Sequence, residues 1–172
     1  MTFARTTYGV ILAGTFLWCC GILLAPACVS AGGDLLPVGN ALFDFYQPIC
    51  HQIPERSIPF LDSHLGVCAR CSAIYLSFFV GMLLYPIGGR LDRPSAPSRI
   101  LLVIALLPVI VDAVGPGPLF YEVTNLTRAV TGGWLGILLP FVLLPIGIQA
   151  VHEIARDIAS TPSLQKGRSN AE

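Results

Sequence analysis

Residues 50–89 read CHQIPERSIPFLDSHLGVCARCSAIYLSFFVGMLLYPIGG, a polar segment that runs directly into an apolar one. The polar part, residues 50–71, holds three cysteines, two histidines and two arginines. The apolar part, residues 71–89, is close to the roughly 20 residues that a helix needs to cross the hydrocarbon of a bilayer. This junction indicates a membrane span that begins beside a cluster of sulfur and imidazole side chains.

Three further apolar blocks occur along the 172 residues, and only 12% of the residues are charged, about half the fraction of a soluble domain. Helices are the expected spans, because an isolated strand would leave its backbone unpaired in lipid. We predict an all-α membrane protein with one four-helix transmembrane domain over residues 1–156. Its spans are residues 8–29, 71–89, 100–119 and 129–152, its outer Cys/His loop is 30–70, which caps one end, and a disordered cytoplasmic tail is 157–172.

The distribution of basic residues predicts the orientation. Seven Lys and Arg residues fall on the side of both termini and three on the opposite side, and basic loops favour the cytoplasm. We therefore expect both termini in the cytoplasm, the Cys/His loop outside, and residence in the cell (inner) membrane. Equal numbers of acidic and basic residues give no basic surface for nucleic acid, so the lipid bilayer is the expected partner. Oligomeric state is left open.

The N-terminus has an alternative interpretation as a cleaved signal peptide. Arg5 precedes an apolar stretch, and Val29 and Ala31 supply small residues before a cut. The apolar core is about 17 residues long, beyond the usual 7–15, so an uncleaved first span is favoured.

The six cysteines divide into two groups. Cys19, Cys20 and Cys28 lie in or at the end of the first span, where a thiol serves as a small apolar side chain. Cys68 and Cys71 form a C-x-x-C at the expected start of the second span, so both sulfurs share one helix face. A helix N-terminus stabilises thiolates, the form of cysteine that binds metals and attacks disulfides.

Three interpretations of this cluster stay open at this stage. A zinc site would use Cys50, Cys68 and Cys71 with His51 or His64 as the fourth ligand. A redox site would cycle Cys68 and Cys71 between dithiol and disulfide, with Cys50 as a relay. A static disulfide would only pin the loop to the helix. Whether the protein is an enzyme is undecided.

Polar residues within the apolar blocks predict a pocket under the cysteines. Asp112 interrupts the third block, and a buried charge normally faces a partner or a watery cavity. We expect an ion pair between Asp112 and Arg128, and a close helix contact at Gly132 and Gly136. A small-molecule or lipid ligand, as in a transporter, would bind here. The predicted polar pocket comprises Arg56, Ser57, Arg70, Tyr75, Asp112, Asn125 and Arg128.

These motifs resemble the domain-of-unknown-function 2085 family of small prokaryotic multi-pass membrane proteins. That family shows C-H-Q, then R-S, C-x-R-C, a later intramembrane Asp, and N-x-x-R before a Gly-rich span. The chain departs from the family at Ala73 and Ser77, where glycine is usual. The matching positions are Cys50, His51, Gln52, Arg56, Ser57, Cys68, Arg70, Cys71, Ile74, Tyr75, Asp112, Asn125 and Arg128.

The architecture is also similar to that of quinone-linked membrane oxidases that generate disulfides. Those proteins have four helices and a C-x-x-C beside a span, so the likeness implies quinone as the electron acceptor under the redox interpretation. Zinc is the cofactor expected under the metal interpretation.

Overall fold

Among the residues that the structure describes, three helices are long and apolar enough to cross a membrane. The computed structural model describes residues 2–88, 99–114, 122 and 124–169. The helices are α1 (Thr2–Ala31), α3 (Ala69–Gly88) and α5 (Asn125–Ser169). Their apolar, membrane-length parts are Ala4–Ala31, Ala69–Ile87 and Asn125–Val151. These segments correspond to three of the four predicted spans.

Helix α4 (Arg99–Val114) occupies the position of the remaining predicted span, residues 100–119. Its apolar part, Ile100–Val114, is a shorter apolar helix. At 1.5 Å per residue it extends about 22 Å, less than the roughly 30 Å of a hydrocarbon core. Residues 115–119 of the prediction lie outside the described residues. The four-span arrangement therefore stays a prediction.

The predicted disordered tail needs correction over most of its length. Helix α5 continues as far as Ser169, through residues 157–169 that we expected to be disordered because they are polar. Adding residues to a helix that already exists costs much less than nucleating one. Residues 170–172 lie outside the described part.

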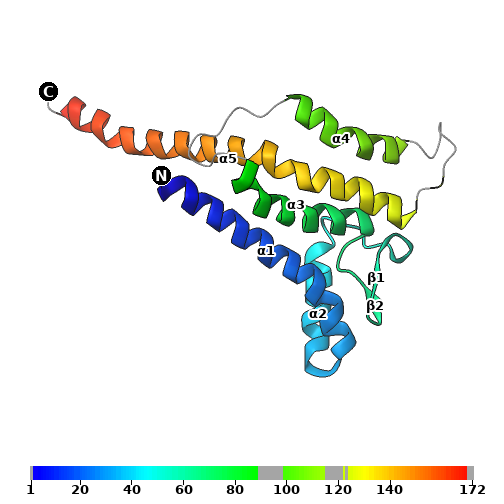
Figure 1. The fold of residues 1–172 in the computed structure, drawn as a ribbon. Helices are drawn as coiled ribbons and strands as arrows, with labels where there is room; N and C mark the ends of the chain where they lie inside the picture. The colour runs from blue at the N-terminus through cyan, green and yellow to red at the C-terminus, as the bar shows by residue number, and fades with distance from the viewer. Residues whose placement is uncertain (1, 89–98, 115–121, 123, 170–172) are drawn as a thin grey trace.

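The helices lie side by side in the order α1, α3, α5, α4 (Figure 1). Helices α3 and α5 run in the same direction, and α1 and α4 run opposite to them (Figure 1). Helix α2 and the two short strands gather at one end, next to the start of α3. The start of α1 and the far part of α5 lie at the other end (Figure 1).

Glycines bring the backbones of α3 and α5 into direct contact. A Cβ atom at Gly132 would lie 2.6 Å from the carbonyl oxygen of Arg70, and one at Gly81 would lie 2.5 Å from that of Ile137. A Cβ atom at Gly136 would collide with the Ser77 hydroxyl and with a backbone carbonyl of α3. The expected close contact at Gly132 and Gly136 is confirmed. It fixes α5 against the first turns of α3, where the C-x-x-C lies.

The predicted outer loop, residues 30–70, contains regular structure that the sequence analysis did not predict. Helix α2 (Leu36–Tyr46) is flanked by the short 3-10 helices η1 (Gly33–Leu35) and η2 (Pro54–Arg56). Strands β1 (Pro59–Phe60) and β2 (Ser63–His64) pair antiparallel.

Helix α2 packs along the end of α1. Gly39 approaches so closely that a Cβ there would lie 2.8 Å from the backbone nitrogen of Val29. Further along, the Tyr46 hydroxyl donates to the carbonyl of Trp18 at 2.8 Å. Pro37 occupies the first turn of α2, where its missing N–H costs no hydrogen bond. The chain leaving α2 is thereby returned to the start of α3.

The glycine contact predicts opposite effects for two neighbouring substitutions in α5. Gly133→Ala should keep or raise the free energy of unfolding by up to about 1 kcal/mol, because Ala favours helix and no heavy atom lies within 4 Å of a Cβ there. Gly136→Ala should lower it by about 1–3 kcal/mol through overpacking against α3. Unfolding in detergent measures both variants, and equal stabilities would contradict the close contact.

Candidate metal centre

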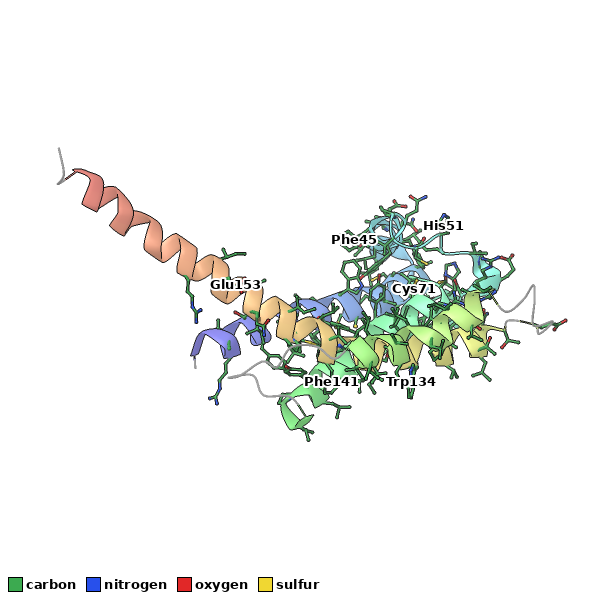
Figure 2. All side chains as sticks on the ribbon, turned by 90° about the horizontal axis from the view of Figure 1, so that it is seen from above. Phe45, His51, Cys71, Trp134, Phe141 and Glu153 are labelled. Atoms are coloured by element: carbon green, nitrogen blue, oxygen red, sulfur yellow. The ribbon has the colours of Figure 1, made fainter. Side chains whose placement is uncertain are left out.

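The sulfur atoms of Cys50, Cys68 and Cys71 converge at the end of the bundle where α3 begins. All three lie within 4.8 Å of one another, although Cys50 is 18 residues from Cys68 in sequence. Cys50 is buried, and Cys68 and Cys71 are half-buried. Figure 2 shows Cys71 and the neighbouring His51 at this end of the molecule. The cysteines that the spacing singled out therefore form one group of sulfur atoms that could hold a metal ion.

The start of α3 places two of the sulfurs. The Cys68 carbonyl accepts the first helical hydrogen bond, from the Ser72 amide at 2.8 Å, so Cys68 caps the helix and Cys71 lies within its first turn. The Ser72 hydroxyl donates to the carbonyl of Val67 at 3.0 Å and so holds Val67, the residue before Cys68, against the first turn of α3. This arrangement confirms that the C-x-x-C lies at a helix N-terminus.

Cys50 reaches the same point from the end of α2. Its amide donates to the Tyr46 carbonyl at 3.0 Å, which continues the last turn of α2. Its sulfur accepts a hydrogen bond from the Cys68 amide at 3.2 Å. Beneath the sulfurs, the apolar side chains of Ile22, Leu65 and others pack around Cys50 as a buried cluster. The loop is therefore anchored to both α1 and α3.

Gln52 positions the loop, although it was not among the predicted site residues. Its backbone has φ of 51°, a left-handed conformation that is uncommon for a residue other than glycine. Its side-chain amide nitrogen donates to the carbonyls of Phe43 and Gly66, each at 2.8 Å. The amide thus ties the end of α2 to the segment before α3. The C-H-Q motif, on which the resemblance to a known family partly rests, already included Gln52.

The electrostatic environment favours a thiolate at Cys68. A side-chain hydrogen bond from Cys71 is the largest influence, and with smaller contributions from Cys50 and the backbone it outweighs the effect of burial. The pKa of Cys68 is lowered to about 5. Positive charge at the N-terminus of α3 acts in the same direction. Cys68 is therefore ionised at neutral pH, as metal binding and thiol chemistry both require.

A cavity of about 180 Å³ adjoins the sulfurs. The three cysteines line it together with His51, Gln52 and Arg56. His51 and Arg56 are exposed side chains at this cavity, and His51 is not among the atoms of the three-sulfur group. The cavity provides space beside the cysteines for a further ligand or for an anion.

His64, the other histidine considered as a ligand, has different partners. Its Nδ1 lies 2.9 Å from the carbonyl oxygen of Leu65, and its ring packs edge-on against Phe43 with centroids 5.3 Å apart. These contacts attach the strand pair to α2. Of the two histidines, only His51 borders the cavity of the cysteines.

The expected ion pair between Asp112 and Arg128 is wrong. Arg70 of α3 forms the ion pair with Asp112 of α4, whose side chain is only 2% exposed. Arg128 instead donates from Nη1 to the Asn125 side-chain oxygen at 3.1 Å. The Arg70 side chain reaches Asp112 from the place where its backbone lies against Gly132 of α5. The transporter interpretation relied on a pocket in which Asp112 and Arg128 form a pair, and these two residues do not pair with each other.

The remaining residues of the predicted polar pocket lie in separate places. The Asn125 amide donates to the carbonyls of Glu55 and Ser57, at 3.1 and 3.3 Å, and so ties η2 to the start of α5. Ser57 itself is buried, and its hydroxyl donates to the Ile53 carbonyl at 2.9 Å. Tyr75 packs against Trp18 on the bundle side of the cysteines. Only Arg56 borders the cysteine cavity with the sulfurs.

Apolar helices of membrane-spanning length indicate a membrane protein, and comparisons with known proteins identify its family. The family model "Predicted membrane protein (DUF2085)" matches residues 50–155, and the chain belongs to this family. The stretch matched includes the C-H-Q and C-x-R-C motifs, which confirms the resemblance seen in the sequence.

Two archaeal relatives are also similar to this chain. Uncharacterized protein MJ1492 of Methanocaldococcus jannaschii is 32% identical over 149 residues, covering 85% of this chain and 96% of the relative. An uncharacterized protein of Methanothermobacter thermautotrophicus is 30% identical over 95 residues, covering 54% of this chain and 81% of the relative. No solved structure matches the chain.

The role of Gln52 predicts a selective effect of one charge change. Gln52→Glu removes both amide hydrogens that tie the loop down. The backbone amide of Cys68, which donates to the Cys50 sulfur, should then exchange its hydrogen roughly tenfold faster. The free energy of unfolding should fall by about 1–3 kcal/mol. Gln47→Glu makes the same chemical change at an exposed position and should leave both quantities unaltered. Hydrogen exchange of the two variants tests this, and indistinguishable Cys68 exchange would contradict it.

Proposed function

We propose that this integral membrane protein binds a zinc ion through the thiolates of Cys50, Cys68 and Cys71. The convergence of the three sulfurs within 4.8 Å carries the proposal. In a tetrahedral zinc site with Zn–S bonds of about 2.3 Å, the sulfurs are about 3.8 Å apart, a separation compatible with this grouping. The lowered pKa of Cys68 favours the ligand form of the thiol.

His51 is the fourth ligand that we propose. It follows Cys50 directly and borders the same cavity, and three thiolates with one imidazole make a common structural zinc set. We further propose that the site lies on the outer face of the cell (inner) membrane, with both termini in the cytoplasm. A bound metal would protect the thiols from oxidation there. Arg56, at the same cavity, would attract an anion to the metal site.

The proposal predicts a metal content that depends on three cysteines but not on a fourth. Protein purified without chelators should hold about one zinc per chain by elemental analysis. The zinc content should fall severely in each of the variants Cys50→Ser, Cys68→Ser and Cys71→Ser. Cys28→Ser removes a half-buried thiol outside the group and should retain the metal.

Metal content of the Cys28→Ser variant provides the matched control for substitution at the site. Wild-type protein that holds no stoichiometric metal, or a Cys71→Ser variant that holds as much as the wild type, would contradict zinc binding. His51→Ala should weaken the site without abolishing it, because three thiolates remain.

A thiol–disulfide oxidoreductase is the second function that we propose, and the ionised Cys68 beside Cys71 favours it. Oxidation of the Cys68 thiolate and the Cys71 thiol to a Cys68–Cys71 disulfide releases two electrons and one proton. A membrane quinone would accept the two electrons and this proton and, with a second proton from water, become the quinol. Cys50, whose sulfur accepts from the Cys68 amide, would then be the relay thiol.

The second function predicts a pH profile for alkylation of Cys68 in reduced, metal-free protein. Because its pKa is lowered to about 5, its alkylation rate should stay level above about pH 6 and fall below about pH 5. Unfolded protein should show the same fall near the ordinary thiol pKa of about 8.5. Cys71→Ala should move the folded profile toward higher pH, and a profile identical to that of unfolded protein would count against the thiolate.

A further inference from the structure

Helix α2 runs back beside the apolar, membrane-length part of α1 and does not lead away from it. At one end, a Cβ at Gly39 would lie 2.8 Å from the backbone nitrogen of Val29. At the other end, a Cβ at Gly21 would collide with the Tyr46 hydroxyl. Gly21 lies ten residues before Ala31, where the membrane-length part of α1 ends, and ten helical residues extend about 15 Å. The end of α2 therefore lies level with the apolar span of α1.

The surface of α2 is divided lengthwise into three faces. Gly39 and Tyr46 belong to the buried face, which packs on α1. The other two faces are exposed, and each contains residues three and four apart, the spacing of one helix side. The apolar face comprises Val38, Ala41 and Phe45, and the polar face comprises Asn40, Asp44 and the capping residue Gln47. Exposed surface that is apolar on one side and polar on the other is typical of a helix at the boundary between lipid and water.

The apolar face of α2 continues the exposed apolar surface of α1. The Phe45 side chain is 58% exposed, and its ring lies 5.6 Å from that of Trp18, between centroids. Phe16 and Leu17, the two residues before Trp18, are also exposed. Figure 2 shows Phe45 at the end of the molecule that carries Cys71. Aromatic side chains are enriched at the membrane–water boundary, so this contact joins α2 to the lipid-facing surface of the span.

Charge and size decide which occupant suits the apolar face. The chain has no Lys or Arg between Arg5 and Arg56, so burial of apolar surface, and not attraction to anionic headgroups, must hold α2 in place. A stable protein–protein interface buries about 800 Å² on each partner. Three side chains, of which the largest is one phenylalanine, supply much less, since a whole aromatic side chain buries about 150–250 Å². Lipid is the occupant that fits.

We propose that α2 lies at the membrane–water boundary of one leaflet, with its apolar face against lipid acyl chains and its polar face toward water. The inference goes beyond both proposed functions and does not depend on zinc. It also sets the depth of the cysteine group. The Cys50 amide donates to the Tyr46 carbonyl at the end of α2, so the three sulfurs lie at the same boundary.

Photocrosslinking to lipid tests the proposal in the full chain, reconstituted into phosphatidylcholine vesicles. The photoreactive amino acid p-benzoylphenylalanine replaces Val38 on the apolar face or, as the matched control, Asn40 on the polar face. Both residues are exposed and lie within one turn of α2. After irradiation, mass spectrometry should find several-fold more phospholipid adduct at position 38 than at position 40. Vesicles that contain phosphatidylglycerol should give the same ratio, because no basic side chain of α2 contributes.

Phe45 and Gln47 provide a second pair, in which the photoreactive residue replaces an aromatic side chain of similar shape at position 45. The same excess of lipid adduct should appear at position 45 over position 47. Equal adducts on the two faces, or none on either, would overturn the proposal. A crosslinked dimer from position 38 or 45 in place of the lipid adduct would assign the apolar face to a second copy of the chain, and would also overturn it. Zinc content is measured separately, so failure here is distinguishable from failure of the metal site.

Discussion

The backbone contact between α3 and α5 is the constraint on which the rest of the structure depends. Gly132 and Gly136 remove the side chains that would otherwise separate the helices, so the carbonyls of Arg70 and Ile74 lie against α5. Because the contact begins at the first turn of α3, it fixes the C-x-x-C relative to the start of α5. The same proximity allows Arg70 to reach Asp112 on α4 and to compensate a carboxylate buried in an apolar environment.

The cysteine group needs a second constraint, because Cys50 arrives through a loop and not along a helix. Helix α2 turns back along α1, and the Gln52 amide ties its end to the segment before α3. The left-handed backbone at Gln52 is a local strain that these two hydrogen bonds offset. The Asn125 amide holds the following turn against α5. Each helix that meets at this end therefore contributes to holding the sulfurs together.

Sequence patterns predicted the parts of the molecule that follow from local chemistry. Apolar length located α1, α3 and α5, and the spacing of Cys68 and Cys71 placed two thiols at the start of one helix. Helix α2 was missed although its apolar residues recur at helical spacing, because the whole stretch between two long apolar blocks was predicted to be a loop. The Arg70–Asp112 pair was missed because sequence gives the depth of a charge but not which helices touch.

The central claim is that the three sulfurs form one metal centre with an imidazole as the remaining ligand. X-ray absorption at the zinc edge of the purified protein tests this claim most directly, since it counts the neighbours of the ion by element and distance. The account predicts three sulfur neighbours at about 2.3 Å and one nitrogen at about 2.0–2.1 Å. A shell of oxygen and nitrogen without sulfur would contradict it.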